Sequence, residues 1–311
     1  MFASMDTLRK AQGEALERLG FGPNECDYQV PASGLRWRLR DYGGPDVGSV
    51  LLIVAAPIKR PYLWDLAPSS SALRYCLRQG LRVYLLEWTP PSRSNGSAGL
   101  AEYAKQAISE AVATVSRETG GMRPFLMGHS LGGTFTAIYV ALRPQNVRGL
   151  VLLSAPLCFQ PGVSRFRDAI VAMAPSSLAE MEIVPGSLLS QLSALASPET
   201  FVWSRLLDAT LSSADPLAWE IHARVERWAL DEVPLPGRLV HQKKGELRYR
   251  GRWLSRRSAQ ARSRAATLGS SVPRIIISRS GRAVGLPLIL PSRHRGVGHA
   301  SQEIPFAAQE P

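Results

Sequence analysis

The chain has 311 residues, of which 45% are hydrophobic and 7% aromatic, a composition that supports a large buried core and excludes a wholly disordered protein. No apolar run approaches the roughly 18–20 residues that a membrane helix needs, which excludes a spanning protein. The net charge of +12 is uneven, because residues 241–311 alone hold 14 basic and three acidic side chains.

Strands and helices alternate along the first half of the chain. The first expected elements are an amphipathic helix at Met5–Arg18 and a half-exposed strand at Leu35–Tyr42, where apolar and polar residues alternate. The later strands are expected at Val50–Ala56, Arg82–Glu87, Pro124–Met127 and Val147–Ser154, and the helices at Ser70–Gln79, Leu100–Thr119 and Leu131–Arg143. This alternation predicts an α/β fold, with a mostly parallel sheet that has helices on both faces.

The pattern changes after Pro156. Up to residue 240 the chain has helix-like stretches interrupted by prolines and no strong strand, which predicts a helical lid over the sheet. From residue 241 Arg, Ser and Gly rise, and one strand-like run, Arg274–Ile277, lies among them. We therefore expect an N-terminal helix and leading strand (1–47), an α/β core (48–156), a helical lid or cap (157–240) and a basic, atypical C-terminal segment (241–311).

The cysteine content and the N-terminal sequence indicate the cellular compartment of the protein. The three cysteines, Cys26, Cys76 and Cys158, argue against a disulfide framework, and Met1–Gly20 lacks the apolar region of a secretory signal. We expect a cytoplasmic protein. Cys76, within a helix pattern, and Cys158, after a core strand, are expected to be buried thiols rather than nucleophiles. No metal-ligand spacing or dinucleotide-binding fingerprint is present, so no metal and no cofactor are expected.

The segment from Gly128 to Gly133, with the sequence GHSLGG, fits the G-x-S-x-G pattern of a nucleophile elbow. A short apolar strand precedes it and a helix follows, so Ser130 is expected at a sharp, strained turn above the sheet. The amide of Leu131 at the helix start can donate to an oxyanion. A second donor is expected in the loop after the Val50–Ala56 strand, at Ile58. These features predict an α/β-hydrolase fold.

The alternative is a glycine-rich turn that contains an incidental serine, and a correct fold does not by itself establish activity. His129, beside the serine, is expected to pack locally rather than to act as a base. Asp65 is expected to fix its own loop by accepting backbone hydrogen bonds.

Several separated blocks resemble the bacterial polyhydroxyalkanoate synthases, including those that make poly(3-hydroxybutyrate). These blocks are Leu52–Leu66, Ser71–Trp88, the elbow with its helix, Val184–Trp203 and Val225–Arg238, and the resemblance covers residues 48–240. The resemblance implies an acyltransferase of the α/β-hydrolase superfamily that acts on hydroxyacyl thioesters of coenzyme A. It also implies a polyester granule surface as a partner. The oligomeric state and the length of the acyl chain are not predicted.

The nucleophile departs from the resemblance. The family's nucleophile is a cysteine in the elbow, whereas this chain has Ser130. A hydroxyl is far less acidic than a thiol, and an oxygen ester has a lower acyl-transfer potential than a thioester. We therefore expect hydrolysis or simple acyl transfer through an acyl-enzyme rather than chain growth.

The catalytic acid and base are the second departure. In this fold the order along the chain is serine, acid, histidine, with the acid after a late strand. The last aspartate is Asp231, and the late strand-like run is followed by Ser278, where the resemblance would place an aspartate. His299, in a glycine-containing loop, is the expected base, ahead of His294 and His241. A chain without the acid–histidine pair would be a catalytically impaired remnant or a binding protein, and a general ester hydrolase is a further alternative.

Three interpretations compete for residues 241–311. A basic arm for nucleic acid is disfavoured, because few aromatic residues accompany the charge, and no nucleic-acid partner is expected. A divergent but folded end of the hydrolase domain is the second. The third, which we favour, is a segment outside the ancestral reading frame, since the resemblance stops near Val240 and aspartate is absent from there on. Translation of the alternative frames of the gene tests this hypothesis.

Overall fold

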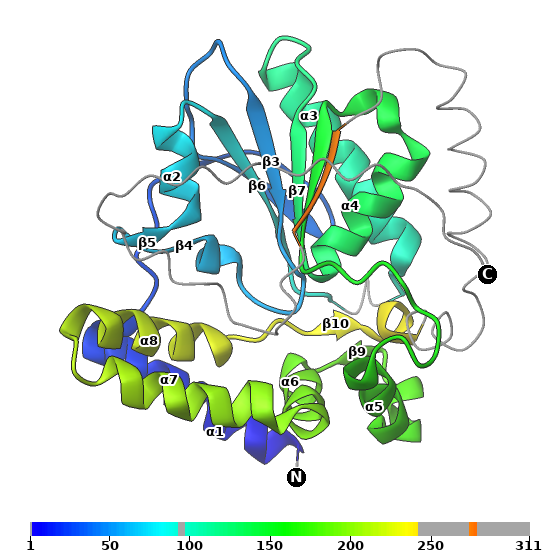
Figure 1. Cartoon of the computed structure of the whole chain (residues 1–311). Helices are drawn as coiled ribbons and strands as arrows, with labels where there is room; N and C mark the ends of the chain where they lie inside the picture. The colour runs from blue at the N-terminus through cyan, green and yellow to red at the C-terminus, as the bar shows by residue number, and fades with distance from the viewer. Residues whose placement is uncertain (1, 93–96, 242–273, 279–311) are drawn as a thin grey trace, which may run out of the picture.

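The seven-stranded central sheet has the strand order β1-β2-β6-β3-β7-β8-β11 in the computed structural model, which describes residues 2–92, 97–241 and 274–278 (Figure 1). The strands in sheet order are β1 (Gln29–Ser33), β2 (Trp37–Asp41), β6 (Arg82–Trp88), β3 (Val50–Val54), β7 (Phe125–His129), β8 (Gly149–Leu153) and β11 (Arg274–Ser278). β2 is antiparallel to both of its neighbours, and all pairings from β6 to β11 are parallel. The predicted mostly parallel sheet is confirmed.

Helices cover both faces of the sheet, with α2 on one side and α3 and α4 on the other (Figure 1). Their bounds are α2 (Ala72–Arg78), η3 (Glu102–Ala107), α3 (Ile108–Glu118), α4 (Leu131–Leu142) and η4 (Pro144–Asn146). Alternate residues of β3 enter different cores: Leu52 packs in the cluster of α3 and α4, and Ile53 in the cluster of α2. Because β3 is buried on both faces, its sequence is a continuous apolar run.

The segment after β8 is largely helical and lies below the sheet in Figure 1, where α1 packs against α8 and α6. Its elements are α5 (Arg165–Met173), η5 (Ser176–Ala179), β9 (Ile183–Val184), α6 (Gly186–Ala196), η6 (Glu199–Trp203), α7 (Ser204–Ser212), α8 (Pro216–Ala229) and β10 (Leu235–Pro236). We call α5 to α8 the cap. The N-terminal helix α1 (Phe2–Leu16), continued by η1 (Glu17–Phe21), reaches α8 through the ion pair of Arg227 with Glu17 at 2.8 Å.

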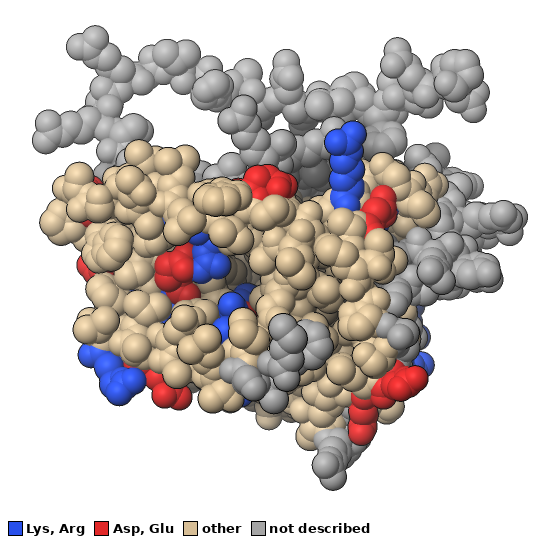
Figure 2. Space-filling view, turned by 90° about the horizontal axis from the view of Figure 1, so that it is seen from below, with Lys and Arg blue, Asp and Glu red and all other residues tan. Residues whose placement is uncertain are grey.

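The face of the cap and α1 is mostly uncharged in Figure 2, and a hollow in it exposes both basic and acidic atoms. Several large apolar side chains of η6 and α7 are exposed to solvent, among them Trp203, Leu207 and Leu211. None of the helices within the described ranges is both long and apolar enough to cross a membrane.

Sequence analysis missed the edge strand β1 and four small strands outside the central sheet. β1 contains Pro31, is mostly exposed and pairs only with β2, so it lacks the apolar pattern of an inner strand. The two-residue strands β9 and β10 pair with each other in an antiparallel manner, as do β4 (Asp65–Ala67) and β5 (Ser70–Ser71). The strand-like run in the C-terminal segment is confirmed as β11, which pairs in parallel with β8.

Candidate active site

Ser130 lies at the turn between β7 and α4, as predicted. Its φ of 51° and ψ of −121° are values that a residue with a side chain rarely adopts. Its backbone N–H donates to the carbonyl of Leu153 in β8 at 2.9 Å, and its carbonyl accepts from Thr134 in α4 at 3.2 Å. The strained turn is therefore held by the neighbouring strand and by its own helix, which is the arrangement of a nucleophile elbow.

The glycines of the motif allow α4 to lie against the strand ends. A Cβ atom on Gly132 would overlap the carbonyl oxygens of Val54 and Ala55, at the end of β3. A Cβ on Gly128 would overlap Thr136 and the backbone of Gly133 in the first turns of α4. At both positions the absence of a side chain allows the close approach of α4 to the strand ends.

Substitution of Gly132 with alanine is expected to lower the free energy of unfolding by about 1–3 kcal/mol, because the new methyl group must displace the backbone of β3 or tilt α4. Urea denaturation measures the effect. The control is Gly13→Ala in α1, where a Cβ would lie 3.3 Å from the Arg227 guanidinium. That change is expected to be neutral or to stabilise the protein by up to about 1 kcal/mol. Equal stability of G132A and the unsubstituted chain would contradict the close contact.

The Ser130 side chain is half-buried and its hydroxyl makes no hydrogen bond to another described residue. Leu131 is the first residue of α4, so its N–H has no acceptor within the helix. Ile58 lies in the loop between β3 and η2 (Pro61–Trp64), beyond the strand end that Gly132 approaches. The parallel arrangement of β3 and β7 brings Ser130, Leu131 and the Ile58 loop to one edge of the sheet.

His299, the predicted base, lies outside the described residues, as does His294. Ser278 is the last residue of β11 and pairs in register with Leu153, the residue whose carbonyl binds the Ser130 amide. The end of this late strand thus reaches the edge where an acid is expected, and the residue there is a serine. Asp231, after α8, is engaged elsewhere: it pairs with Arg227 at 3.5 Å and with Arg60 at 3.8 Å.

His129 packs against Trp64, with the ring centroids 6.0 Å apart and the rings nearly perpendicular. Its burial lowers the pKa of the imidazole, which favours the neutral form. The expectation that His129 packs locally is confirmed. Cys76 is half-buried, but Cys158 is exposed in the loop after β8, so the prediction of a buried thiol is wrong for Cys158. A residue after a buried strand is already part of the connection to the cap.

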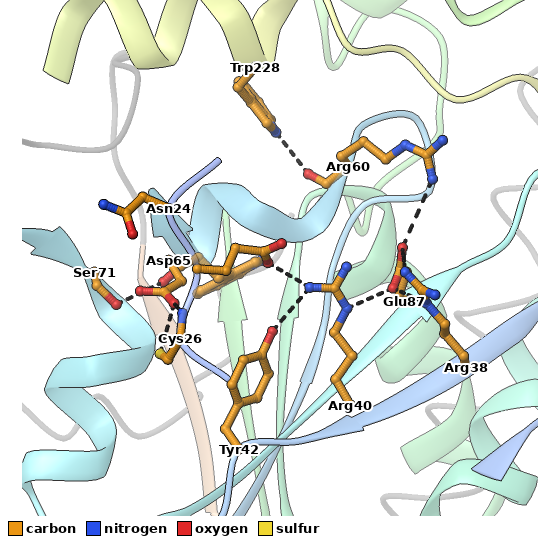
Figure 3. A network of polar contacts seen from close by, with 12 residues as sticks. Asn24, Cys26, Arg38, Arg40, Tyr42, Arg60, Asp65, Ser71, Glu87 and Trp228 are labelled. Atoms are coloured by element: carbon orange, nitrogen blue, oxygen red, sulfur yellow. Dashed lines mark hydrogen bonds and ion pairs between the residues drawn. The ribbon is translucent and has the colours of Figure 1, made fainter. Parts of the chain in front are cut away.

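Asp65 accepts a backbone hydrogen bond as expected, but the donor is the N–H of Cys26, in a distant segment, rather than a residue of its own loop (Figure 3). It also accepts from the Cys26 thiol at 2.8 Å and from Arg74 at 2.8 Å. Burial, with the hydrogen bond to Asp65, raises the pKa of the Cys26 thiol to about 11, so the thiol stays protonated. Asp65 therefore joins the segment before β1 to α2.

A buried ionic network that sequence analysis missed lies beside the site, around Glu87 near the end of β6 (Figure 3). The Glu87 carboxylate is 3% exposed and accepts from Arg38, and from Arg40 at 2.6 Å. Arg40 also donates to Glu25 at 2.6 Å and to Tyr42 at 3.2 Å. Burial alone would raise the pKa of Glu87, but the two guanidinium groups outweigh it and hold the pKa below its usual value. The alternating arginines of β2 are the sequence signal for this network.

Comparison with known proteins agrees with this geometry. The family model described as alpha/beta hydrolase fold matches residues 65–271. The poly(3-hydroxyalkanoate) polymerase subunit PhaC of Haloferax mediterranei is 33% identical over 198 residues, which cover 62% of this chain and 40% of that protein. The PhaC subunit of Synechocystis sp. is 28% identical, with 72% of this chain and 61% of that protein covered. The PhaC subunit of Allochromatium vinosum is 28% identical, with 76% of this chain and 70% of that protein covered. The match to the first two thus spans less than two thirds of their length.

Proposed function

This chain belongs to the alpha/beta hydrolase fold family, and we propose that it is an acyltransferase or hydrolase that acts on hydroxyacyl thioesters through Ser130. The observation that carries the proposal is the Ser130 hydroxyl, which makes no hydrogen bond to a described residue and lies on a strained turn at the N-terminus of α4. The similarity to poly(3-hydroxyalkanoate) polymerase subunits supports the substrate class. A polyester granule surface is the proposed partner, and the cytoplasmic location stays a prediction.

The proposed reaction has two steps. In the first, the Ser130 oxygen attacks the thioester carbonyl while His299 accepts the hydroxyl proton, and the N–H groups of Leu131 and Ile58 stabilise the oxyanion. The carbon–sulfur bond then breaks, the coenzyme A thiol leaves with the proton, and an acyl ester remains on the serine. In the second step water, or the hydroxyl of another hydroxyacyl group, attacks this ester and regenerates Ser130.

The chemistry of the nucleophile favours hydrolysis in the second step, because an oxygen ester has a lower transfer potential than the thioester formed by a cysteine. Incubation with a 3-hydroxyacyl-CoA is therefore expected to release free coenzyme A and the free hydroxy acid, without polymer. Thiol titration measures the first product, and gas chromatography after methanolysis distinguishes acid from polyester. Accumulation of polymer would overturn the preference for hydrolysis but not the role of Ser130.

A catalytically impaired remnant is the second candidate, and the serine at the end of β11 favours it, since no carboxylate stands at that register position. A fluorophosphonate probe distinguishes the two candidates, because it reacts only with an activated serine. Covalent labelling that mass spectrometry maps to Ser130 supports the enzyme. A folded protein that neither reacts with the probe nor releases coenzyme A supports the remnant.

A further inference from the structure

The Ile58 loop is held by the chain that follows α8. The backbone N–H of Val233 donates to the carbonyl of Ile58 at 2.9 Å, and Lys59 forms an isolated antiparallel bridge with Glu232. The indole of Trp228 donates to the carbonyl of Arg60 at 2.8 Å (Figure 3). Three consecutive residues of the loop are thus attached to the last turn of α8 and to the segment after it.

The Lys59 side chain is the centre of these contacts. Its ammonium donates to the carbonyl of Ala229 and to the Glu232 carboxylate at 3.0 Å, and it lies 5.8 Å from the centroid of the Trp228 ring. Arg9 of α1 binds the same two acceptors, the Ala229 carbonyl and the Glu232 carboxylate. The Glu232 side chain is 6% exposed and that of Lys59 is 15% exposed. A single buried carboxylate therefore joins the loop, the end of the cap and the N-terminal helix.

We propose that Lys59 is a positioning residue, which holds the Ile58 amide where it can bind the oxyanion. The inference rests on the proposed function. The Ile58 N–H belongs to the peptide bond after Pro57, whose ring fixes its own φ, and the Ile58 carbonyl is already bonded to Val233. The contacts of Lys59 hold the next peptide bond, between Ile58 and Lys59. Oxyanion donors act only when they are already in position before the reaction. Loss of the Lys59 contacts therefore weakens transition-state stabilisation more than substrate binding.

The charge of this cluster depends on pH, so turnover is expected to depend on pH as well. Burial lowers the pKa of Lys59 to about 8; Glu232 acts to raise it, and Arg9 and Arg205 act to lower it further. Burial would raise the pKa of Glu232, but Lys59 and Arg9 outweigh this effect and the pKa is lowered. Glu232 therefore stays ionised while Lys59 loses its proton as the pH rises through about 8. Turnover by the unsubstituted chain is expected to decline over that range, because the ammonium–carboxylate attraction is lost.

The test compares Lys59→Met, Lys59→Arg and Glu232→Gln with the control Lys10→Met, since Lys10 is an exposed lysine of α1 that pairs with Asp6. With a 3-hydroxyacyl-CoA as substrate, K59M is expected to lower kcat about 10- to 100-fold and to change KM less than about threefold. The loss of kcat is smaller than that caused by removal of an oxyanion donor, because the Ile58 amide is misplaced rather than removed. E232Q should resemble K59M. K59R should restore kcat and remove the decline near pH 8, and K10M should match the unsubstituted chain.

Three results would overturn the inference while the unsubstituted chain is active: kcat unchanged in K59M, a rise in KM alone, or an alkaline decline that persists in K59R. Thermal unfolding identifies a variant that fails to fold, and the comparison of the alkaline decline in the unsubstituted chain with that in K59R then tests the inference without K59M. An unsubstituted chain that neither turns over substrate nor reacts with fluorophosphonate overturns the proposed function, and with it the role of Lys59. The two failures are therefore distinguishable.

Discussion

Replacement of Ser130 with alanine is expected to lower kcat by at least about 10³-fold and to abolish fluorophosphonate labelling. The free energy of unfolding is expected to change by less than about 1 kcal/mol, because the hydroxyl makes no hydrogen bond to another described residue. Alanine also tolerates the positive φ no better than serine, so the strain of the turn stays the same. Steady-state kinetics and urea denaturation measure the two quantities.

Ser154 provides a matched control. It follows β8 at the same edge of the sheet and also has a positive φ, 48°, but it is exposed and lies outside the GHSLGG motif. Ser154→Ala is expected to retain both labelling and turnover. Persistence of either property in S130A would show that another group attacks the substrate, and the proposed mechanism would then be wrong.

Replacement of Glu87 with glutamine is expected to lower the free energy of unfolding by about 3–5 kcal/mol at pH 7, because the nearly buried Arg40 then lacks its anionic partner. Glu118→Gln is the control: its carboxylate is exposed and lies 3.8 Å from Arg117, so a change below about 1 kcal/mol is expected. Urea denaturation of both variants measures the difference. A loss in E87Q no larger than that in E118Q would contradict a structural role for the network.

The same network predicts how stability depends on pH. The folded-state pKa of Glu87 is lowered, so its contribution to stability is fully present above the unfolded-state pKa and is lost as the pH falls through the folded value. The difference between E87Q and the unsubstituted chain should therefore be largest near neutral pH and should shrink in acid. A difference that stays constant down to the acid transition would contradict this assignment of the charge.

The inner strands and the elbow were predictable from local sequence. β3, β6 and β8 are covered on both faces, and such burial demands continuous apolar runs that no other element of this length needs. The glycines at 128 and 132 were informative for a related reason: each stands where any side chain would overlap the neighbouring backbone or side chain. Burial and close contact restrict the residue type at each such position, so these features can be predicted from the sequence.

The polar part of the site was not predictable in the same way. The hydrogen-bond acceptors of Lys59 are 170 and 173 residues away along the chain, and the carboxylate that links Arg38 to Arg40 comes from another strand. No local sequence pattern predicts contacts between residues that are so far apart along the chain. The acid and the base stay predictions, because His299 lies outside the described residues and the late strand ends in Ser278.

The contacts of Arg9 with Ala229 and Glu232 join residues that are 220 and 223 positions apart. During synthesis at about 5–20 residues per second, the N-terminal helix emerges tens of seconds before its acceptors exist. Throughout that interval Arg9 lacks the two acceptors that it binds in the complete fold. Docking of the first helix is therefore complete only after the ribosome has passed residue 232, and termination just before that point would leave Arg9 without the Glu232 carboxylate.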